Sequence, residues 1–543
     1  MTIEIKIRNV TSEIHGVNSS HEHALEFGLS YFDTGAVFTR AYQRGTWDGR
    51  KYLYKIASAR ANYGKFPSGL ISRVVKIIND QFPNEPIAYQ DLREKPLQQH
   101  PLLLPGVELF DYQQEAVNKA IEVERGLFRA PTGSGKSVIE AAIVARLNLP
   151  TLVMSHRLEI LEHLKTIIEK SLGFEVGLIQ GSNKKVQRFN VAMIQTIASC
   201  YKRRLFDKNA ARVVKFIEEE CQLLIVDEAH HSSSASYEEF TNRAYRAYYR
   251  MGWSATPSIG EDTDMLAEAA FGRLQFSMTP SDLIKQKRLS KPYIFFFDYG
   301  DDSQDNPVVT QCNDCGNRQL IPIAGPGGKE IRPNDGDDES SLMPNALRMV
   351  SYKCRPCDKE WTTYMDSTVR CIVRNDKRNH AIATLAAERI RKGMSVLVLV
   401  QYIEHGREIT DRIKKLVDPT LVQFVYSETE NKKMYLDQLG IKQKMCLVAT
   451  SVFGEGIDLP SLNALIIAKS SASPIDIVQS VGRALRRSSG KWKTVICDFV
   501  DRSKHFRKRS TFRKKLLAQE PEYIIKTIKR NFEDEYNTIG VSK

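Results

Sequence analysis

A short glycine-rich segment, APTGSGKS at residues 130–137, carries the residue types that bind the phosphates of a nucleoside triphosphate. Its glycines let backbone N–H groups approach phosphate oxygens, and a helix that starts directly after the turn adds its N-terminal dipole. Lys136 would reach the β- and γ-phosphates, and the Ser137 hydroxyl would bind Mg²⁺. Ala130 departs from the glycine usual at the first position, and a turn without a ligand is the structural alternative. The residues expected to line the site are Thr132, Gly133, Ser134, Gly135, Lys136 and Ser137.

Two adjacent carboxylates, Asp227 and Glu228, follow the apolar run LLIV. Such a run predicts a buried strand, and α/β proteins bind ligands at the carboxyl ends of their strands. Asp227 would complete the Mg²⁺ shell, and Glu228 would polarise the water that attacks the γ-phosphate. Because two buried charges are costly without a partner, a purely structural role is the weaker interpretation.

The elements that position these residues follow a repeated pattern of apolar strand, polar turn and helix. Such runs are typical of parallel strands buried on both faces, and their alternation with helices predicts a doubly wound α/β sheet. The pattern appears twice, which predicts two α/β lobes. The expected boundaries are 1–98 for a small α+β N-terminal domain, 99–297 for lobe 1, 298–372 for an insertion, 373–500 for lobe 2 and 501–543 for a basic helical tail.

Two Cys-x-x-Cys pairs in the insertion predict a structural zinc ribbon, with unligated thiols as the alternative. The four ligands would be Cys312, Cys315, Cys354 and Cys357. Four thiolates leave no open position for a catalytic water. A segment this small cannot build its own core, so the metal would hold it together, and either DNA or a protein could be its partner.

The composition favours a nucleic-acid partner and an intracellular setting. The 543 residues carry a net charge of +13 at pH 7, which attracts an acidic polymer. The nine cysteines are too sparse for a disulfide framework. The start MTIEIKIRNV does not resemble a signal peptide, and no run approaches the ~20 apolar residues that span a bilayer. We therefore expect a cytoplasmic protein without a membrane partner.

Five segments resemble motifs of the superfamily 2 helicases, in that family's order: APTGSGKS, VDEAH, WSATP, VATSVFGEGIDLP and QSVGRALRR. The resemblance implies two RecA-like lobes, ATP and Mg²⁺ as cofactors, and an ATP-dependent helicase activity. It implies that Gln113, in FDYQQEA, reads the adenine edge. It also implies coupling roles for His230, Ser254, Thr256 and Gln479, nucleotide contacts from Gly456 and Asp458, and γ-phosphate contacts from Arg483 and Arg486. A solvated basic helix face is the alternative for the two arginines.

The expected nucleic-acid contacts rest on shorter resemblances. MSHRLEILEH and MIQTI resemble strand-contacting motifs of the family, which implies phosphate contacts for Arg157, Gln195 and Thr196. The basic and aromatic segment around Trp47 and Arg50 resembles the leading domain of phage recombination helicases of the UvsW type. This implies unwinding, branch migration and fork regression on branched DNA, with recombination or replication proteins as partners; a core tryptophan that anchors a hairpin is the alternative. A duplex translocase like a restriction motor, and an ATP-gated scaffold without catalysis, are the competing functions.

Overall fold

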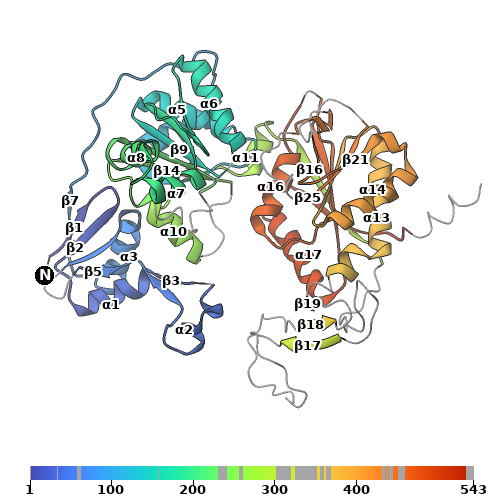
Figure 1. The fold of residues 1–543 in the computed structure, drawn as a ribbon, viewed down its shortest axis with the longest axis horizontal. Coiled ribbons are helices and arrows are strands. Elements are labelled where there is room, and N and C mark those ends of the chain that lie inside the picture. Colours follow the sequence, from blue (N-terminus) through green and yellow to red (C-terminus); the bar gives the residue numbers. More distant parts are fainter. Residues whose placement is uncertain are drawn as a thin grey trace, which may run out of the picture. The chain divides into compact units, whose positions relative to one another are not determined.

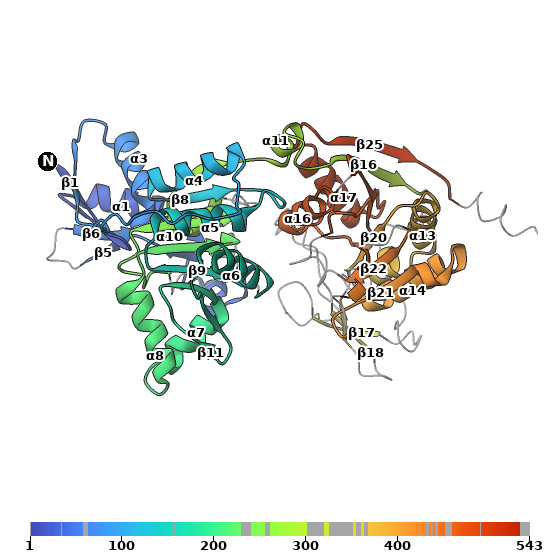
Figure 2. The same ribbon diagram turned by 90° about the horizontal axis from the view of Figure 1, so that it is seen from above.

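The computed structural model divides into two compact units, Met1–Leu283 and Ile284–Lys543, which are described separately (Figures 1 and 2). It describes residues 2–33, 35–57, 63–156, 158–229, 241–255, 261–300, 320–324, 351–354, 360–362, 368–430, 434–435, 438–439, 444–450, 459–488 and 490–532. Across these ranges, none of the helices has the length and apolar content needed to cross a bilayer.

The N-terminal domain is a five-stranded sheet, in the order β5-β6-β2-β1-β7, packed against two helices. Ile3 and Ile5 of β1 and Ile14 of β2 belong to the core that α1 and α3 complete, and buried positions alternate along both strands as the period of two residues requires. The strands are β1 (Ile3–Ile7), β2 (Thr11–His15), β5 (Lys55–Ile56), β6 (Tyr63–Pro67) and β7 (Ile87–Asp91), and the helices are α1 (Ser19–Gly28), η2 (Ser68–Leu70) and α3 (Ile71–Gln81).

A small module projects from this domain between α1 and β5. Its two strands, β3 (Ser30–Phe32) and β4 (Arg50–Tyr52), pair antiparallel, and η1 (Ala36–Phe38) and α2 (Arg40–Gln43) connect them. Gly49 has φ +79° and packs so closely that an added Cβ would lie 2.5 Å from the Phe32 ring. Only glycine therefore fits this entry into β4.

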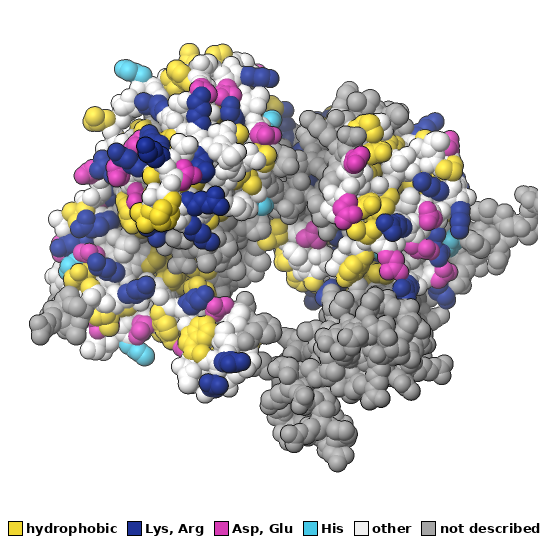
Figure 3. Space-filling view, viewed as in Figure 1, with side chains coloured by type: hydrophobic (Ala, Val, Ile, Leu, Met, Phe, Trp, Pro, Cys, Tyr) yellow, Lys and Arg dark blue, Asp and Glu magenta, His cyan; other side chains and the backbone are white. Residues whose placement is uncertain are grey.

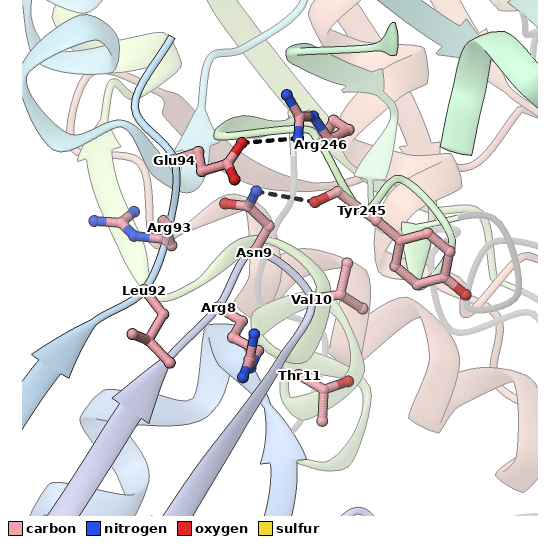
Figure 4. A pocket seen from close by; sticks show the side chains of 9 residues that line it. All are labelled: Arg8, Asn9, Val10, Thr11, Leu92, Arg93, Glu94, Tyr245 and Arg246. Atoms are coloured by element: carbon pink, nitrogen blue, oxygen red, sulfur yellow. Dashed lines mark hydrogen bonds and ion pairs between the residues drawn. The ribbon is translucent and has the colours of Figure 1, made fainter. Parts of the chain in front are cut away.

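The N-terminal domain and lobe 1 form one compact unit rather than two separate bodies. The Asn9 side chain donates to the Tyr245 carbonyl at 2.9 Å, and Arg246 pairs with Glu94 at 2.8 Å (Figure 4). These residues line a cleft of about 340 Å³ at the junction. An added Cβ at Gly69 would lie 1.9 Å from the Glu268 carbonyl oxygen, so the N-terminal domain and lobe 1 are in close backbone contact.

Lobe 1 contains an eight-stranded sheet in the order β11-β10-β12-β9-β13-β14-β8-β15, parallel except for β11. The strands are β8 (Arg125–Arg129), β9 (Thr151–Ser155), β10 (Gly177–Gln180), β11 (Asn183–Lys184), β12 (Phe189–Met193), β13 (Leu223–Asp227), β14 (Tyr249–Ser254) and β15 (Leu274–Ser277). The helices are α4 (Asp111–Val123), α5 (Lys136–Leu147), α6 (Leu158–Leu172), α7 (Ile194–Arg203), α8 (Lys208–Lys215), η3 (Phe216–Glu220), α10 (Glu261–Phe271) and α11 (Pro280–Lys285). Helices α4, α5 and α6 share one apolar core, and α7, α8 and α10 share the other. The predicted doubly wound lobe is confirmed.

Lobe 2 contains a seven-stranded parallel sheet in the order β21-β22-β20-β23-β24-β16-β25. The strands are β16 (Lys291–Asp298), β20 (Val396–Val400), β21 (Val422–Val425), β22 (Cys446–Thr450), β23 (Ala464–Ile467), β24 (Lys493–Phe499) and β25 (Ile524–Lys529). The helices are η5 (Val369–Val373), α13 (Asp376–Arg391), α14 (Ile403–Leu416), η6 (Pro419–Leu421), α16 (Pro474–Ala484) and α17 (Lys504–Leu517).

Two predicted boundaries differ from this topology. The strand that closes the predicted lobe 1, β16, pairs with β24 and β25 and so belongs to the sheet of lobe 2. The tail predicted as a helix contains α17 but also β25, which forms the edge of the same sheet. Local pattern identifies such strands but not their partners, because parallel pairing joins segments far apart in the sequence.

The insertion contributes a three-stranded antiparallel sheet of β17 (Leu320–Ala324), β18 (Ser351–Cys354) and β19 (Glu360–Thr362). Strand β17 follows the first cysteine pair in the sequence, and β19 follows the second. Cys354 ends β18, whereas Cys312, Cys315 and Cys357 lie outside the described residues. Among the described residues no group of His, Cys, Asp and Glu could hold a metal ion, so the zinc site stays a prediction.

Candidate nucleotide-binding site

The predicted phosphate-binding turn connects β8 to α5, as its sequence implies. Gly133 and Gly135 have φ of +89° and +76°, the left-handed region that favours glycine. Ala130 is not among the residues with positive φ, so this position does not require glycine. Its N–H donates to the Ser254 carbonyl at 3.0 Å, which ties the start of the turn to the end of β14.

Gln113 of α4 supports this turn through hydrogen bonds. Its amide nitrogen donates to the Ser134 carbonyl at 3.0 Å, and its amide oxygen accepts from the Phe110 N–H at 3.0 Å. The Tyr112 hydroxyl donates to the same Ser134 carbonyl at 3.0 Å. Because an added Cβ at Gly135 would lie 2.5 Å from the Gln113 amide nitrogen, the turn and α4 fit together only with glycine. Gln113 is thus a buried support of the turn, and its contact with adenine stays a prediction.

Lys136 and the acid pair meet at the carboxyl edge of the sheet. The Lys136 ammonium lies 3.2 Å from an Asp227 oxygen and 3.4 Å from a Glu228 oxygen. Burial alone would lower the pKa of Lys136, but the two carboxylates raise it above its ordinary value. Burial raises the pKa of Asp227, which Lys136 opposes. The structure brings these three residues together, and their catalytic roles stay predictions.

Glu228 has a backbone φ of +53°, a conformation uncommon for a residue with a side chain. Its N–H donates to the Asp227 carboxylate at 2.9 Å, which helps to hold the turn. Strain of this kind costs roughly 1–3 kcal/mol and persists at functional positions. The positive φ of Glu228 directs its carboxylate into the same site as that of Asp227. In a regular strand, two consecutive side chains would point to opposite faces.

Glu140 belongs to this cluster, and its role was not predicted. It is fully buried in α5, and neither carboxylate oxygen has a hydrogen-bond partner within the described part of the chain. Burial, and then the charge of Asp227, raise the pKa of Glu140 well above its ordinary value, against the effect of Lys136. The raised pKa favours the uncharged carboxyl at this position. The only sequence signal was a lone acid in the apolar run VIEAAIV.

In lobe 2 the predicted arginines lie at the end of α16. Arg483 approaches the Gln479 amide oxygen at 3.5 Å. The helix end is held by the buried Lys491, whose ammonium donates to the carbonyls of Ala484 at 2.6 Å and Arg486 at 2.7 Å. A positive charge at a helix C-terminus is favourable. Lys491 therefore positions the arginine segment, a role that its place in a polar loop did not indicate.

A second buried lysine supports the other half of α16. Lys469 donates to the Ser480 hydroxyl at 3.1 Å and pairs with Asp476. Burial lowers the pKa of Lys469 despite this carboxylate. Gly456 and Asp458, the other nucleotide contacts predicted for lobe 2, lie outside the described residues.

The predicted nucleic-acid residues divide into exposed and structural ones. Gln195 is exposed at the start of α7, whereas the buried Thr196 hydroxyl accepts from the Gly181 N–H at 2.9 Å. The Trp47 indole donates to the Arg50 carbonyl at 2.9 Å. The Arg50 guanidinium donates to the Ser30 hydroxyl at 2.9 Å and lies over an aromatic ring of α1. Arg157, His230 and Thr256 lie outside the described residues.

Models of known protein families match residues in both lobes. Residues 106–259 match the family described as type III restriction enzyme, res subunit, and residues 376–488 match the helicase conserved C-terminal domain. The first range contains the phosphate-binding turn and the acid pair, and the second contains α16. These are the two lobes whose geometry is described above.

The individual relatives have low sequence identity to this chain, but the similarity extends over most of its length. A DNA 3'-5' translocase, XPB2 of Sulfurisphaera tokodaii, is 23% identical over 391 residues, which is 71% of this chain and 80% of that protein. The ATP-dependent DNA helicase uvsW of enterobacteria phage T4 is 22% identical over 507 residues, or 88% of this chain and 86% of that one. A fragment described as an HsdR subunit of a type I restriction enzyme from Vibrio vulnificus YJ016 shares the fold, with a TM-score of 0.52, 16% identity, and coverage of 78% of this chain and 68% of that one. The two family matches thus fall in order on lobe 1 and lobe 2, the second of them a helicase domain, and the chain shares the fold of the HsdR fragment.

Proposed function

We propose that this chain is an ATP-dependent DNA helicase that unwinds and remodels branched DNA during phage recombination, repair or replication, in the cytoplasm of the host cell. The observation that carries the proposal is the buried cluster of Lys136, Asp227 and Glu228 beside a phosphate-binding turn. The similarity to the phage DNA helicase, which extends over 88% of the chain, supports the choice of DNA. The branched substrate rests on the resemblance of the segment around Trp47 and Arg50 to helicases of the UvsW type.

The residues present fit MgATP. Backbone N–H groups of the turn would bind phosphate oxygens, and Lys136 would exchange its carboxylate partners for the β- and γ-phosphates. Ser137 and Asp227 would hold Mg²⁺, which neutralises phosphate charge, and Glu228 would orient the attacking water. Gln113 would keep the turn in place beside the adenine.

Arg483 and Arg486 would supply positive charge to the γ-phosphate from lobe 2. Since they belong to a different compact unit from Lys136, hydrolysis would require the two units to close on the nucleotide. Gly456 and Asp458 would join that contact. His230, Ser254, Thr256 and Gln479 would transmit closure to the nucleic-acid track.

In lobe 1, Gln195 and Arg157 would contact DNA phosphates. In the projecting module Trp47 and Arg50 hold the fold, so the exposed Arg40 and Arg44 are better placed for phosphates. Figure 3 shows Lys and Arg side chains spread over the face of the first unit among acidic ones, so net charge alone does not locate the track.

The four cysteines of the insertion would bind one structural Zn²⁺. The antiparallel strands β17, β18 and β19 support a ribbon. Metal analysis of freshly purified protein should find about one equivalent of zinc, and replacement of Cys354 by Ser should remove it. Less than about half an equivalent in the unmodified chain would contradict the site.

The decisive experiment compares ATPase and strand displacement on forked DNA, a four-way junction, single-stranded DNA and RNA. Glu228→Gln should abolish DNA-stimulated hydrolysis, and the exposed Glu122→Gln should not. Hydrolysis that survives Glu228→Gln would refute the catalytic assignment. A duplex translocase without strand separation is the second candidate, because the lobe 1 family and the HsdR likeness both come from restriction enzymes. Hydrolysis on DNA without displacement or branch migration would favour it.

A further inference from the structure

Two large apolar side chains stand exposed together between α7 and α8. Leu205 is 80% exposed and Phe206 is 91% exposed. Burial of a single side chain of this size is worth about 1.5–3 kcal/mol, so a chain that leaves two neighbours in water forgoes a large stabilisation. Single exposed apolar residues are ordinary, but an adjacent pair at a loop tip calls for a partner.

The tip is firmly held, so its exposure does not follow from a loose loop. The N–H groups of Phe206 and Asp207 both donate to the Arg203 carbonyl, at 2.9 and 3.0 Å. Asp207 then caps α8 by accepting from the Asn209 and Ala210 N–H groups at 2.9 and 3.1 Å. Helices α7, α8 and the short β11 lie together at one end of lobe 1 (Figure 2).

The charges next to the tip in the sequence are mainly positive. Four exposed cations flank it in sequence, and the one acid, Asp207, is used in the cap and paired with Lys184 at 3.0 Å. The flanking cations are Lys202, Arg203, Arg204 and Lys208. We call these four cations the basic collar of the tip. An apolar tip next to such cations matches the two surfaces of a nucleic acid, since phosphates bind cations and bases stack on aromatic rings.

The tip follows helix α7 directly, and Gln195 lies in the first turn of that helix. Helix α7 has 10 residues and is therefore about 15 Å long. DNA whose phosphate contacts Gln195 could bring a base roughly four steps away to Phe206, at 3.4 Å per step. Resting on the proposed function, we infer that Leu205 and Phe206 form an apolar wedge that stacks on bases where two DNA strands part, while the four flanking cations hold the phosphates.

Binding and unwinding are tested separately. Phe206→Trp keeps an aromatic ring and reports on stacking, so its added fluorescence should be quenched by forked DNA with the nucleotide absent. The Leu205→Ala/Phe206→Ala double variant should keep its single-strand-stimulated ATPase within about twofold and lose about tenfold in fork unwinding. Leu103→Ala, also 84% exposed but outside the basic collar, is the matched control and should leave both unchanged.

The outcomes separate the wedge from the helicase function. Quenching of Phe206→Trp by DNA in a chain that lacks ATPase activity would support the wedge and refute the helicase. Full unwinding by the double variant, with no quenching, would overturn the wedge while the helicase stands. Quenching by anionic vesicles instead of DNA, or loss of a self-associated state in the double variant, would assign the tip to a membrane or to a second copy and overturn the proposal.

Discussion

Each lobe buries a cluster of charges, and the two clusters are balanced differently. Among the described residues of lobe 1, Lys136 faces three acids: Asp227, Glu228 and Glu140. In lobe 2, Arg513 binds Asp498 through two contacts of 2.8 Å, and Arg378 binds Asp501 at 2.9 Å. The first cluster lies at the edge of a sheet, and the second joins β24, α13 and α17 inside the fold.

This difference distinguishes a ligand-binding site in lobe 1 from a structural ion-pair cluster in lobe 2. A balanced buried pair with good geometry holds elements together and needs no ligand. In lobe 1 the acids share Lys136, and the raised pKa of Glu140 favours its uncharged form. Such a cluster has carboxylates that can bind a divalent cation, and Lys136 can then exchange its carboxylate contacts for phosphate oxygens. Substitutions should therefore cost stability in lobe 2 and activity in lobe 1.

The largest expected effect is on the lobe 2 pair. Arg513→Met leaves the buried Asp498 without its partner and should destabilise the chain by about 3–5 kcal/mol. Urea unfolding followed by circular dichroism measures this. Arg513→Met combined with Asp498→Leu should recover part of the loss. A single variant as stable as the unmodified chain would remove the contrast between the lobes.

Lys136→Ala should lower DNA-stimulated ATPase activity about 100-fold or more, because it removes a preorganised charge from the phosphates. Its unfolding midpoint in urea should change far less than that of Arg513→Met. Phosphate release and urea unfolding measured on the same preparation test both halves of the statement. Activity within tenfold of the unmodified chain would contradict it.

Glu140→Gln should have a smaller, pH-dependent effect. The pKa of Glu140 is raised in the folded state, so its contribution to stability is present below its ordinary value of 4.5 and is lost as pH rises through the folded pKa. The Gln variant loses nothing in that window. Its Tm should equal that of the unmodified chain near pH 4 and exceed it near pH 8. Equal Tm values across the range would show that Glu140 is not held protonated.

The smallest effect should come from an exposed pair on lobe 1. Arg212 binds Glu220 at 2.5 and 3.0 Å, but both side chains are solvated. Arg212→Ala should therefore cost under about 1 kcal/mol in urea unfolding. A cost near that of Arg513→Met would show that burial is not what separates these pairs.

Much of the nucleotide site was predictable because its signals are local. Glycines with positive φ stand beside the lysine that they position, and the two acids are consecutive at the end of an apolar run. Alternating strands and helices also predicted the fold class. The roles of Glu140, Lys469 and Lys491 were not predictable, because each depends on a neighbour brought close only by packing.

The sequence by itself determined the residue types of the nucleotide site, the order of its elements and the two-lobed α/β class, since turn geometry and strand periodicity are properties of short segments. Tertiary structure alone decided that β16 and β25 join lobe 2. It also decided that Arg50 and Thr196 are supports, and that Leu205 and Phe206 stay in water. The physical reason is that burial and pairing depend on what lies opposite a side chain, which residue order along one segment does not specify.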